Sequence, residues 1–297
     1  MKPSYGKKTL FSQTIVIVLS LLAGSLSAQQ QIKLQLVYLP ETRYVTESEV
    51  SVESNVIFEE IDDSGQQEEN TGAYMPFGMI LDQKVSSVMQ TGTRDTQGSF
   101  PWQIHFEEFD ANVTIEGESM DINLGGIDSV IINGYVDSTG QMSVKSFTGH
   151  FDQEQEQTLT NFMDNVIKQV KFPDQSISVG ESFTISQPLN VPLGDMAVFE
   201  MLMETVFLLN KIEDNLAFFD ITIHMTLNSD MDIGLMTADG NGNGTMVVDI
   251  NQGLPLESTT EMDLNMKIES PGLSVTAFTK NYASTKMTII NDSDASE

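Results

Sequence analysis

The chain has 297 residues, of which 43 are Asp or Glu and 14 are Lys or Arg, so its formal net charge at pH 7 is −29. Because nucleic acids and anionic membrane surfaces attract clustered Lys and Arg, this charge disfavours both as partners. A hydrophobic content of 40% excludes wholesale disorder, and the absence of cysteine excludes disulfides, thiolate metal sites and a lipid-modified cysteine.

Residues 1–28 have the composition of a secretory signal peptide. Lys2, Lys7 and Lys8 precede the apolar run 14–23, and small residues follow it up to Ala28. The apolar run is much shorter than the ~20 residues that a membrane-spanning helix needs. We therefore predict an exported protein, periplasmic or extracellular, that begins near Gln29 and has no transmembrane segment in the mature chain.

Residues 29–150 are predicted to form an N-terminal antiparallel β segment. Apolar and polar residues alternate with a period of two over 50–58 and 104–115, which is typical of strands with one wet face. The consecutive Glu107 and Glu108 shift this alternation by one residue, as a β-bulge does. The acidic stretch 62–70 has almost nothing to bury and is expected to be a solvated loop. Residues 137–140 have the composition of a turn.

Residues 151–172 break this rhythm and are predicted to contain an amphipathic helix from about 153 to 170. Leu159, Phe162 and Met163 begin an apolar stripe at helical spacing, Asp152 precedes it as a cap, and Pro173 follows it. An amphipathic helix must bury its apolar stripe, so we expect this one to lie on a sheet.

Residues 173–292 are predicted to form a C-terminal antiparallel β segment, followed by a disordered tail at 293–297. The alternation is clearest over 221–227 and 261–268, and residues 213–215 and 239–244 have turn compositions. The apolar stretch 198–209 fits a helix or a buried strand equally well. The predicted fold is mainly β, with long antiparallel curved sheets in two similar segments and one helix between them. The sequence leaves open whether these segments form one sheet or two domains.

One segment matches part of a calcium-binding loop. Asp239, Asn241 and Asn243, with Gly244, fit the first six positions of a loop in which alternate oxygen atoms face one ion. The twelfth position is Ile250 in place of the bidentate Glu, and strands flank the segment. Because Asn and Gly are also typical of hairpin turns, a plain turn is the alternative. No other cofactor is predicted.

Catalytic signatures are sparse. The triplet 63–65 reads Asp-Ser-Gly, as in aspartic proteases, but acidic residues precede it where an apolar strand should lead into such a turn. The three histidines, His105, His150 and His224, lie far apart in sequence, and no two have metal-ligand spacing. We therefore predict that the protein is not an enzyme.

Methionine is unusually frequent, with 17 residues in the chain. Its long, polarizable side chain adapts to varied apolar ligands, although it also fills ordinary cores. If the helix covers the C-terminal sheet incompletely, an apolar ligand would lie between them, lined by Met225, Leu227, Met262, Leu264, Met266, Phe162 and Met163.

Two segments carry a resemblance to a family. Residues 172–185, with Val179-Gly180-Glu181-Ser182-Phe183, and residues 242–249 resemble an uncharacterised family of exported bacterial β-rich proteins. Phe183 stands where many such proteins have Trp. The resemblance implies an exported antiparallel sheet and no functional residue. More distantly, the chain is similar to lipoprotein-carrier half-barrels, in which a curved sheet clasps acyl chains against a helix.

The sequence thus predicts an exported, non-catalytic binding protein for an apolar or acylated ligand. The alternative is a structural or surface-associated component of the cell envelope whose partner is another protein.

Overall fold

The computed structural model describes residues 31–60, 75–121, 129–149, 172–193, 197–227, 235–270 and 273–291. Their elements are β-strands, with these bounds: β1 Gln31–Ile32, β2 Thr42–Glu60, β3 Met75–Thr91, β4 Phe100–Ile115, β5 Glu118–Asp121, β6 Ile131–Val136, β7 Met142–Thr148, β8 Ile177–Ser178, β9 Ser182–Leu193, β10 Ala197–Glu213, β11 Leu216–Leu227, β12 Leu235–Asp249, β13 Leu254–Ser270 and β14 Leu273–Asn291.

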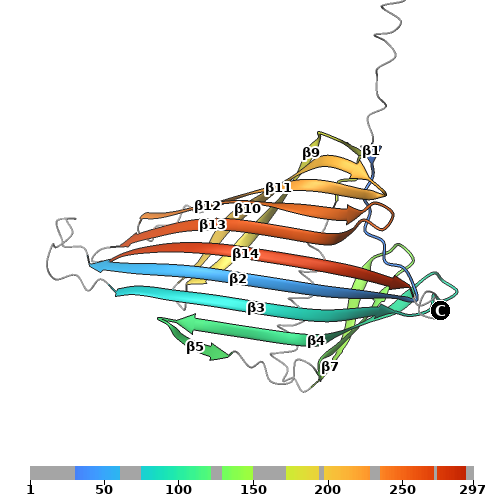
Figure 1. The fold of residues 1–297 in the computed structure, drawn as a ribbon, viewed down its shortest axis with the longest axis horizontal. Helices are drawn as coiled ribbons and strands as arrows, with labels where there is room; N and C mark the ends of the chain where they lie inside the picture. Colours follow the sequence, from blue (N-terminus) through green and yellow to red (C-terminus); the bar gives the residue numbers. More distant parts are fainter. Residues whose placement is uncertain are drawn as a thin grey trace, which may run out of the picture.

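Twelve of these strands form one antiparallel sheet (Figure 1). Its order is β7-β6-β4-β3-β2-β14-β13-β12-β11-β10-β9, with β5 paired to β4. Strands β2 and β14, from opposite ends of the chain, pair over their whole lengths from Thr42↔Asn291 to Glu60↔Leu273. The two predicted β segments therefore share one continuous sheet, and the predicted fold class is confirmed.

Two predicted turns are confirmed by their backbone geometry. Asp214 and Asn215 join β10 to β11 and have φ angles of 49° and 63°, which Asn and Asp tolerate in tight hairpin turns. Between β6 and β7, the Asp137 carboxylate accepts hydrogen bonds from the backbone N–H groups of Thr139 and Gln141. These bonds, with that from the Thr139 hydroxyl, lower the pKa of Asp137.

The phase shift in β4 is a β-bulge, as predicted. Ser86 of β3 pairs with Glu108, but Ser87 pairs with Phe106, so Glu107 has no partner position across the strands. The apolar positions 100–106 and 109–115 therefore face the same side of the sheet. The ambiguous stretch 198–209 lies within strand β10.

The predicted turn at residues 239–244 is wrong. Asp239 to Gly244 lie within β12 and pair with both neighbours, β11 and β13. Glycine and asparagine are poor strand formers, but both flanking strands supply a complete hydrogen-bond ladder, and this tertiary pairing overrides local propensity.

Several predictions fall on residues outside the described ranges. These are the leader 1–28, the acidic loop 62–70, the helix 153–170 and the tail 293–297. Within the ranges that are described, no helix has the length and hydropathy needed to cross a membrane.

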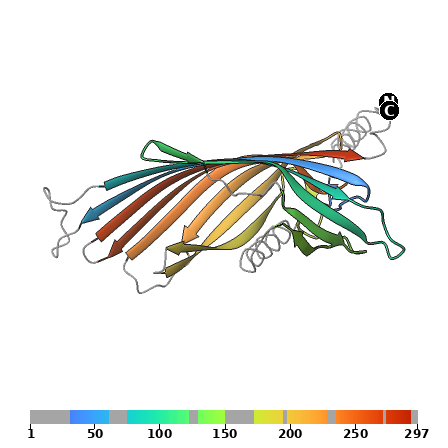
Figure 2. The same ribbon diagram turned by 90° about the horizontal axis from the view of Figure 1, so that it is seen from below.

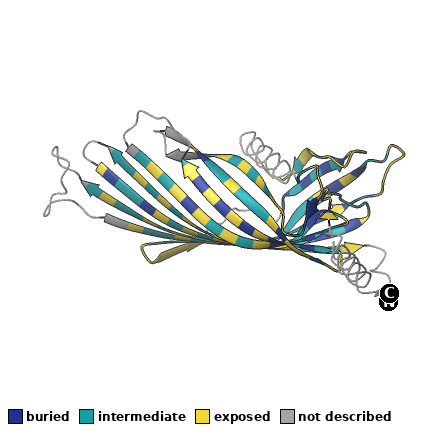
Figure 3. Cartoon of the chain, turned by 90° about the horizontal axis from the view of Figure 1, so that it is seen from above, coloured by how far each residue is buried: buried dark blue, intermediate teal, exposed yellow. Residues whose placement is uncertain are grey.

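The sheet is strongly arched, with β6 and β7 bending under it at one side and β9 and β10 at the other (Figure 2). Buried residues gather at the end where β1, β6 and β7 lie, which is the right-hand end of Figure 1 (Figure 3). Away from this end, exposed and partly buried residues alternate along the long strands.

Candidate ligand-binding face

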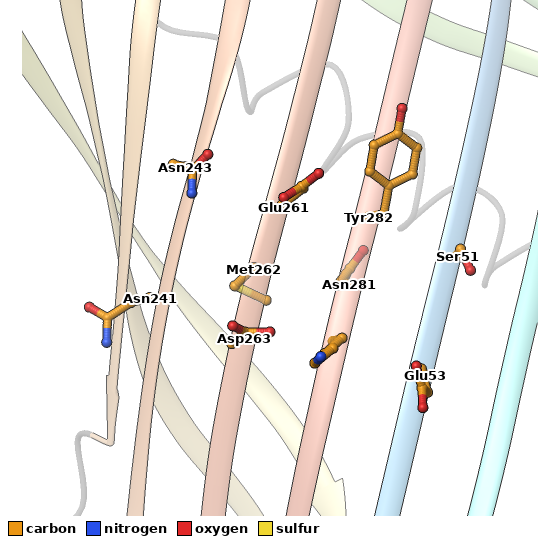
Figure 4. A pocket seen from close by; sticks show the side chains of 10 residues that line it. Ser51, Glu53, Asn241, Asn243, Glu261, Met262, Asp263, Asn281 and Tyr282 are labelled. Atoms are coloured by element: carbon orange, nitrogen blue, oxygen red, sulfur yellow. The ribbon is translucent and has the colours of Figure 1, made fainter.

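The two faces of the sheet differ in charge. Glu53, Lys280 and Asp263 lie directly opposite one another on β2, β14 and β13, and so share one face. The preceding or following residue of each strand, such as Val52 or Met262, points to the other face. Figure 4 shows Glu261 and Asp263 standing up from the sheet, with Met262 between them pointing away.

The uncharged face is the concave one. The core cluster around Trp102 joins Ile132 and Val136 of β6 to Tyr44 of β2 and Leu254 at the start of β13. β6 and β13 are separated by four strands in the sheet, so their side chains meet only on the inside of the arch. The face that carries this cluster is therefore the inner face.

The inner face has no charged side chain over most of its area. From Thr42 to Phe58 of β2, the inward positions are Thr, Tyr, Ser, Val or Phe. The inward positions of β3, β14 and β13 that pair with them are likewise apolar or uncharged. On β13 they include Met262, Leu264, Met266 and Ile268. The register places Glu47, Glu49 and their paired lysines on the outer face. Such a division gives the sheet one apolar face and one charged, solvated face.

The N-terminal segment 31–38 covers one end of the inner face; we call it the strap. Ile32 and Leu34 are buried in one core cluster, while Leu36 and Tyr38 pack against the other. The strap thus bridges the two sides of the arch. Its backbone is held by the β1–β8 pairing and by a hydrogen bond of 2.7 Å from Val37 N–H to the carbonyl of Gln252.

Gly253 lets the strap pass. It has a φ of 61°, and a Cβ there would collide with the carbonyl group of Gln35. Any other residue would meet both backbone strain and a backbone clash that no side-chain rotation relieves. Glycine at this position therefore allows the β12–β13 turn to contact the strap directly.

Two tyrosines close the end of the strap. The rings of Tyr38 and Tyr44 pack edge to face, with centroids 5.4 Å apart, and the Tyr44 hydroxyl accepts a hydrogen bond from Leu39 N–H. Burial raises the pKa of Tyr38 to about 12, with a smaller contribution from Tyr44. Burial also raises the pKa of Tyr44. Both side chains are therefore neutral near pH 7.

The motif that carried the family resemblance has a structural role. Glu181 accepts a hydrogen bond from Ser178 N–H, and Gly180 has a φ of 88°, which turns the chain into β9. Phe183 then stacks on Phe207 with centroids 4.9 Å apart and meets Phe219 edge on. These contacts anchor the edge of the sheet under the arch.

The opposite end of the inner face, which we call the open end, is less well covered. Phe58, Phe77 and Leu273 point inward there and are 39%, 36% and 39% exposed. Val52, Val56 and Leu81 are only partly buried. An apolar surface shared by neighbouring strands is typical of a binding site.

The predicted lining residues lie on this inner face. Met225 is 5% exposed, whereas Leu227, Met262, Leu264 and Met266 are partly buried. The register places Met225 opposite Gly240, and Gly240 lies opposite Leu264, so these residues form one patch across β11, β12 and β13. Phe162 and Met163 lie outside the described residues.

The residues predicted to bind calcium lie on the outer face. Asp239, Asn241 and Asn243 are alternate residues of β12, so their side chains are spaced by about 6.6 Å along a straight strand. This differs from a loop that wraps around one ion. Among the described residues, no group of three or more His, Cys, Asp and Glu is placed to hold a metal. Calcium binding by this row stays a prediction.

The intervening glycines point inward and make room for large neighbours. Gly240, Gly242 and Gly244 lie opposite Met225, Ile223 and Ile221. A Cβ at Gly242 or Gly244 would collide with a carbonyl oxygen of β13. Sequence reasoning missed this role, although the strict Gly alternation has the period of two that is typical of a strand.

Comparisons with known proteins give no family. No family model matches the chain, and no curated protein matches it. Among solved structures, the translocator domain of autotransporter NalP from Neisseria meningitidis has 8% identity and a TM-score of 0.28, covering 92% of this chain and 95% of that one. An outer membrane channel from Pseudomonas putida has 7% identity and a TM-score of 0.20, covering 86% and 98%. TM-scores of this size do not establish a shared fold, so what those proteins do has no bearing on this chain.

Proposed function

We propose that the protein is an exported, non-catalytic carrier that binds an apolar or acylated molecule on the inner face of its arched sheet. The observation that carries this proposal is the open end, where the large apolar side chains of Phe58, Phe77 and Leu273 are partly exposed. Burying a fully exposed Phe or Leu side chain contributes about 1.5–3 kcal/mol, and each side chain of the open end would contribute the fraction of this that its exposed area represents. An acyl chain that covers several of them gains affinity.

The methionines favour an acyl chain over a rigid ligand. Met225, Met262 and Met266 lie on β11 and β13, with glycine-rich β12 between them. Thioether side chains adjust to ligands of varied shape. A surface of this kind can bind a flexible hydrocarbon chain without requiring that the ligand have one rigid shape.

Strand pairing at the sheet edge is less well supported as the main function. The edge strand β9 contains Pro188 and Pro192, each of which lacks the N–H group that a further strand would use. At the other edge, β7 has a register irregularity where it pairs with Asn133 and Gly134. Both features interrupt continuous pairing with another protein.

The test is uptake of a fluorescent fatty acid by delipidated protein. Met266→Trp fills the open end and should reduce uptake by about tenfold or more, because the added indole occupies the space that the chain needs. Asn265→Trp places the same ring on the outer face of the same strand and should leave uptake unchanged.

Stability must be measured alongside binding. If the inner face is already filled, Met266→Trp would instead destabilise the fold by about 1–3 kcal/mol. Absence of uptake by the wild-type protein, or equal loss in both Trp variants, would refute the carrier proposal.

A further inference from the structure

The outer face has a second feature, a shallow groove made of two hollows that meet. The first, of about 410 Å³, is lined by side chains of β12, β13, β14 and β2 (Figure 4). The second, of about 340 Å³, continues over β2, β3 and β4. Both hollows include Ser51 and Tyr282, so Tyr282 stands near the middle of the groove.

The groove runs across the strands. Six neighbouring strands contribute to it, and at a spacing of about 4.8 Å they span about 24 Å. On the outside of an arched sheet, side chains diverge from one another. The first hollow lies between the rows that start at Ser51 and Glu53, and the second lies between the rows that start at Glu49 and Ser51. A long, narrow ligand would therefore shift by one row where it passes Tyr282.

The groove combines an exposed ring with closely spaced hydrogen-bonding groups. The Tyr282 side chain is 40% exposed. Beside it lie Glu261 on β13, Ser51 on β2 and Lys280 on its own strand. Carboxylates accept hydrogen bonds, ammonium groups donate them, and amides and hydroxyls do both. A ligand with many hydroxyl groups can use all of these.

Much of this capacity is unused within the described part of the chain. The side chains of Glu53, Glu261, Asp263 and Lys280 form no hydrogen bond or ion pair with other described residues. By contrast, Asn241 pairs with His224 Nδ1 at 3.0 Å. The first four side chains are therefore available to a ligand, while Asn241 is already oriented by its neighbour.

Charge narrows the class of ligand. Carboxylates outnumber lysines in the groove, which repels anionic ligands. Lys280 lies between Glu53 and Asp263, where its ammonium group disfavours a bare metal ion. A neutral ligand is subject to neither repulsion, and the excess of carboxylates over lysines attracts an amine-bearing one.

We propose that this groove binds an uncharged or amine-bearing oligosaccharide. The C–H groups of a sugar ring pack against the electron-rich face of Tyr282, and its hydroxyl groups bond the carboxylate, amide and ammonium groups around it. The site lies on the face opposite to the proposed acyl site, so the two proposals stand or fall separately.

The test is calorimetric titration of the full mature chain with neutral and amine-bearing oligosaccharides of two to six units, such as cello- and chitosan oligomers. Tyr282→Ala should weaken binding by about tenfold or more, as is typical of a central aromatic contact. Phe278→Ala is the matched control, because Phe278 is 46% exposed on the same face of β14 but lines neither hollow. It should leave binding unchanged.

Length dependence tests the continuity of the groove. Lys84→Ala changes only the second hollow, so it should weaken binding of the six-unit ligand and leave the two-unit ligand unaffected. Circular dichroism of each variant confirms that the fold is retained.

Several results would overturn the proposal. These are no binding of any oligosaccharide, equal binding by wild type and Tyr282→Ala, binding of a basic peptide alone, or binding of calcium alone.

Discussion

The strapped end and the open end belong to one sheet and follow the same alternation of side chains, yet they differ in what covers the inner face. Phe219 and Phe58 both point inward, but Phe219 is 1% exposed and Phe58 is 39% exposed. Phe219 lies in the cluster with Ile32 and Leu34 of the strap. Burial here depends on what crosses the arch and not on the residue type. The strapped end therefore holds most of the described core, while the open end leaves apolar side chains partly exposed.

The largest expected effect compares these two phenylalanines. Phe219→Ala removes a fully buried ring and should lower the free energy of unfolding by about 3–5 kcal/mol. Phe58→Ala removes a partly exposed ring and should cost about 1 kcal/mol. Urea titration of both variants measures the difference. Equal losses would mean that the open end is packed as tightly as the strapped end.

A second comparison uses two glycines in strands. A Cβ at Gly134 would collide with the Trp102 ring and with the Ser143 carbonyl oxygen, so Gly134→Ala should destabilise the fold by about 1–3 kcal/mol. At Gly78, near the open end, the nearest atom would be Asn55 Oδ1 at 3.4 Å. Gly78→Ala should be neutral or stabilising by up to about 1 kcal/mol. Thermal unfolding of both variants measures this difference in stability. A Gly78→Ala variant less stable than the wild type would contradict the prediction.

The strap should weaken at high pH. Tyr38 has its pKa raised to about 12 in the folded protein, against 10.0 in the unfolded chain. The contribution of the neutral Tyr38 side chain to the free energy of unfolding is therefore complete below pH 10 and is lost as the pH rises toward 12. A rise of about two pKa units corresponds to a loss of at most about 3 kcal/mol.

Tyr38→Phe provides the control for this pH dependence, because it keeps the ring and removes the ionisable hydroxyl. Its unfolding free energy should fall less between pH 10 and pH 12 than that of the wild type. Tyr44, whose pKa is also raised, accounts for the pH dependence of the unfolding free energy that remains in Tyr38→Phe. Parallel pH profiles of the two proteins would show that Tyr38 does not titrate as proposed.

The smallest expected effect concerns an ion pair on the outer face. Arg43 and Glu107 lie 3.0 Å apart, but both side chains are 42% exposed. Glu107→Gln should therefore change the free energy of unfolding by less than about 1 kcal/mol, and less still in high salt. A loss comparable to that of Phe219→Ala would show that the outer face, too, determines stability.

Much of the fold could be predicted from the sequence. The period-two runs at 50–58, 221–227 and 261–268 predicted long strands, and each lies within one. The doubled glutamate predicted the bulge of β4, and Asp214 with Asn215 predicted a hairpin turn. These features depend on neighbours in sequence, where side-chain alternation and turn chemistry act directly.

The candidate site could be predicted only in part. The alternation placed Met262, Leu264 and Met266 on one face, and the structure confirms that they share it. It could not say whether that face is inside or outside the arch. The segment 239–244 was predicted as a turn because its composition is typical of one, although its two neighbours hold it in a strand.

The sequence by itself determined the period of the strands, the turns at 137–140 and 213–215, and the separation of apolar from charged faces, because each follows from residues one to four positions apart. Only the tertiary structure decided that β2 pairs with β14, that the apolar face is concave and that the strap crosses it next to Gly253. These arrangements join residues more than 200 positions apart. Their energy comes from burying surface contributed by distant strands, and no local pattern records which strands will meet.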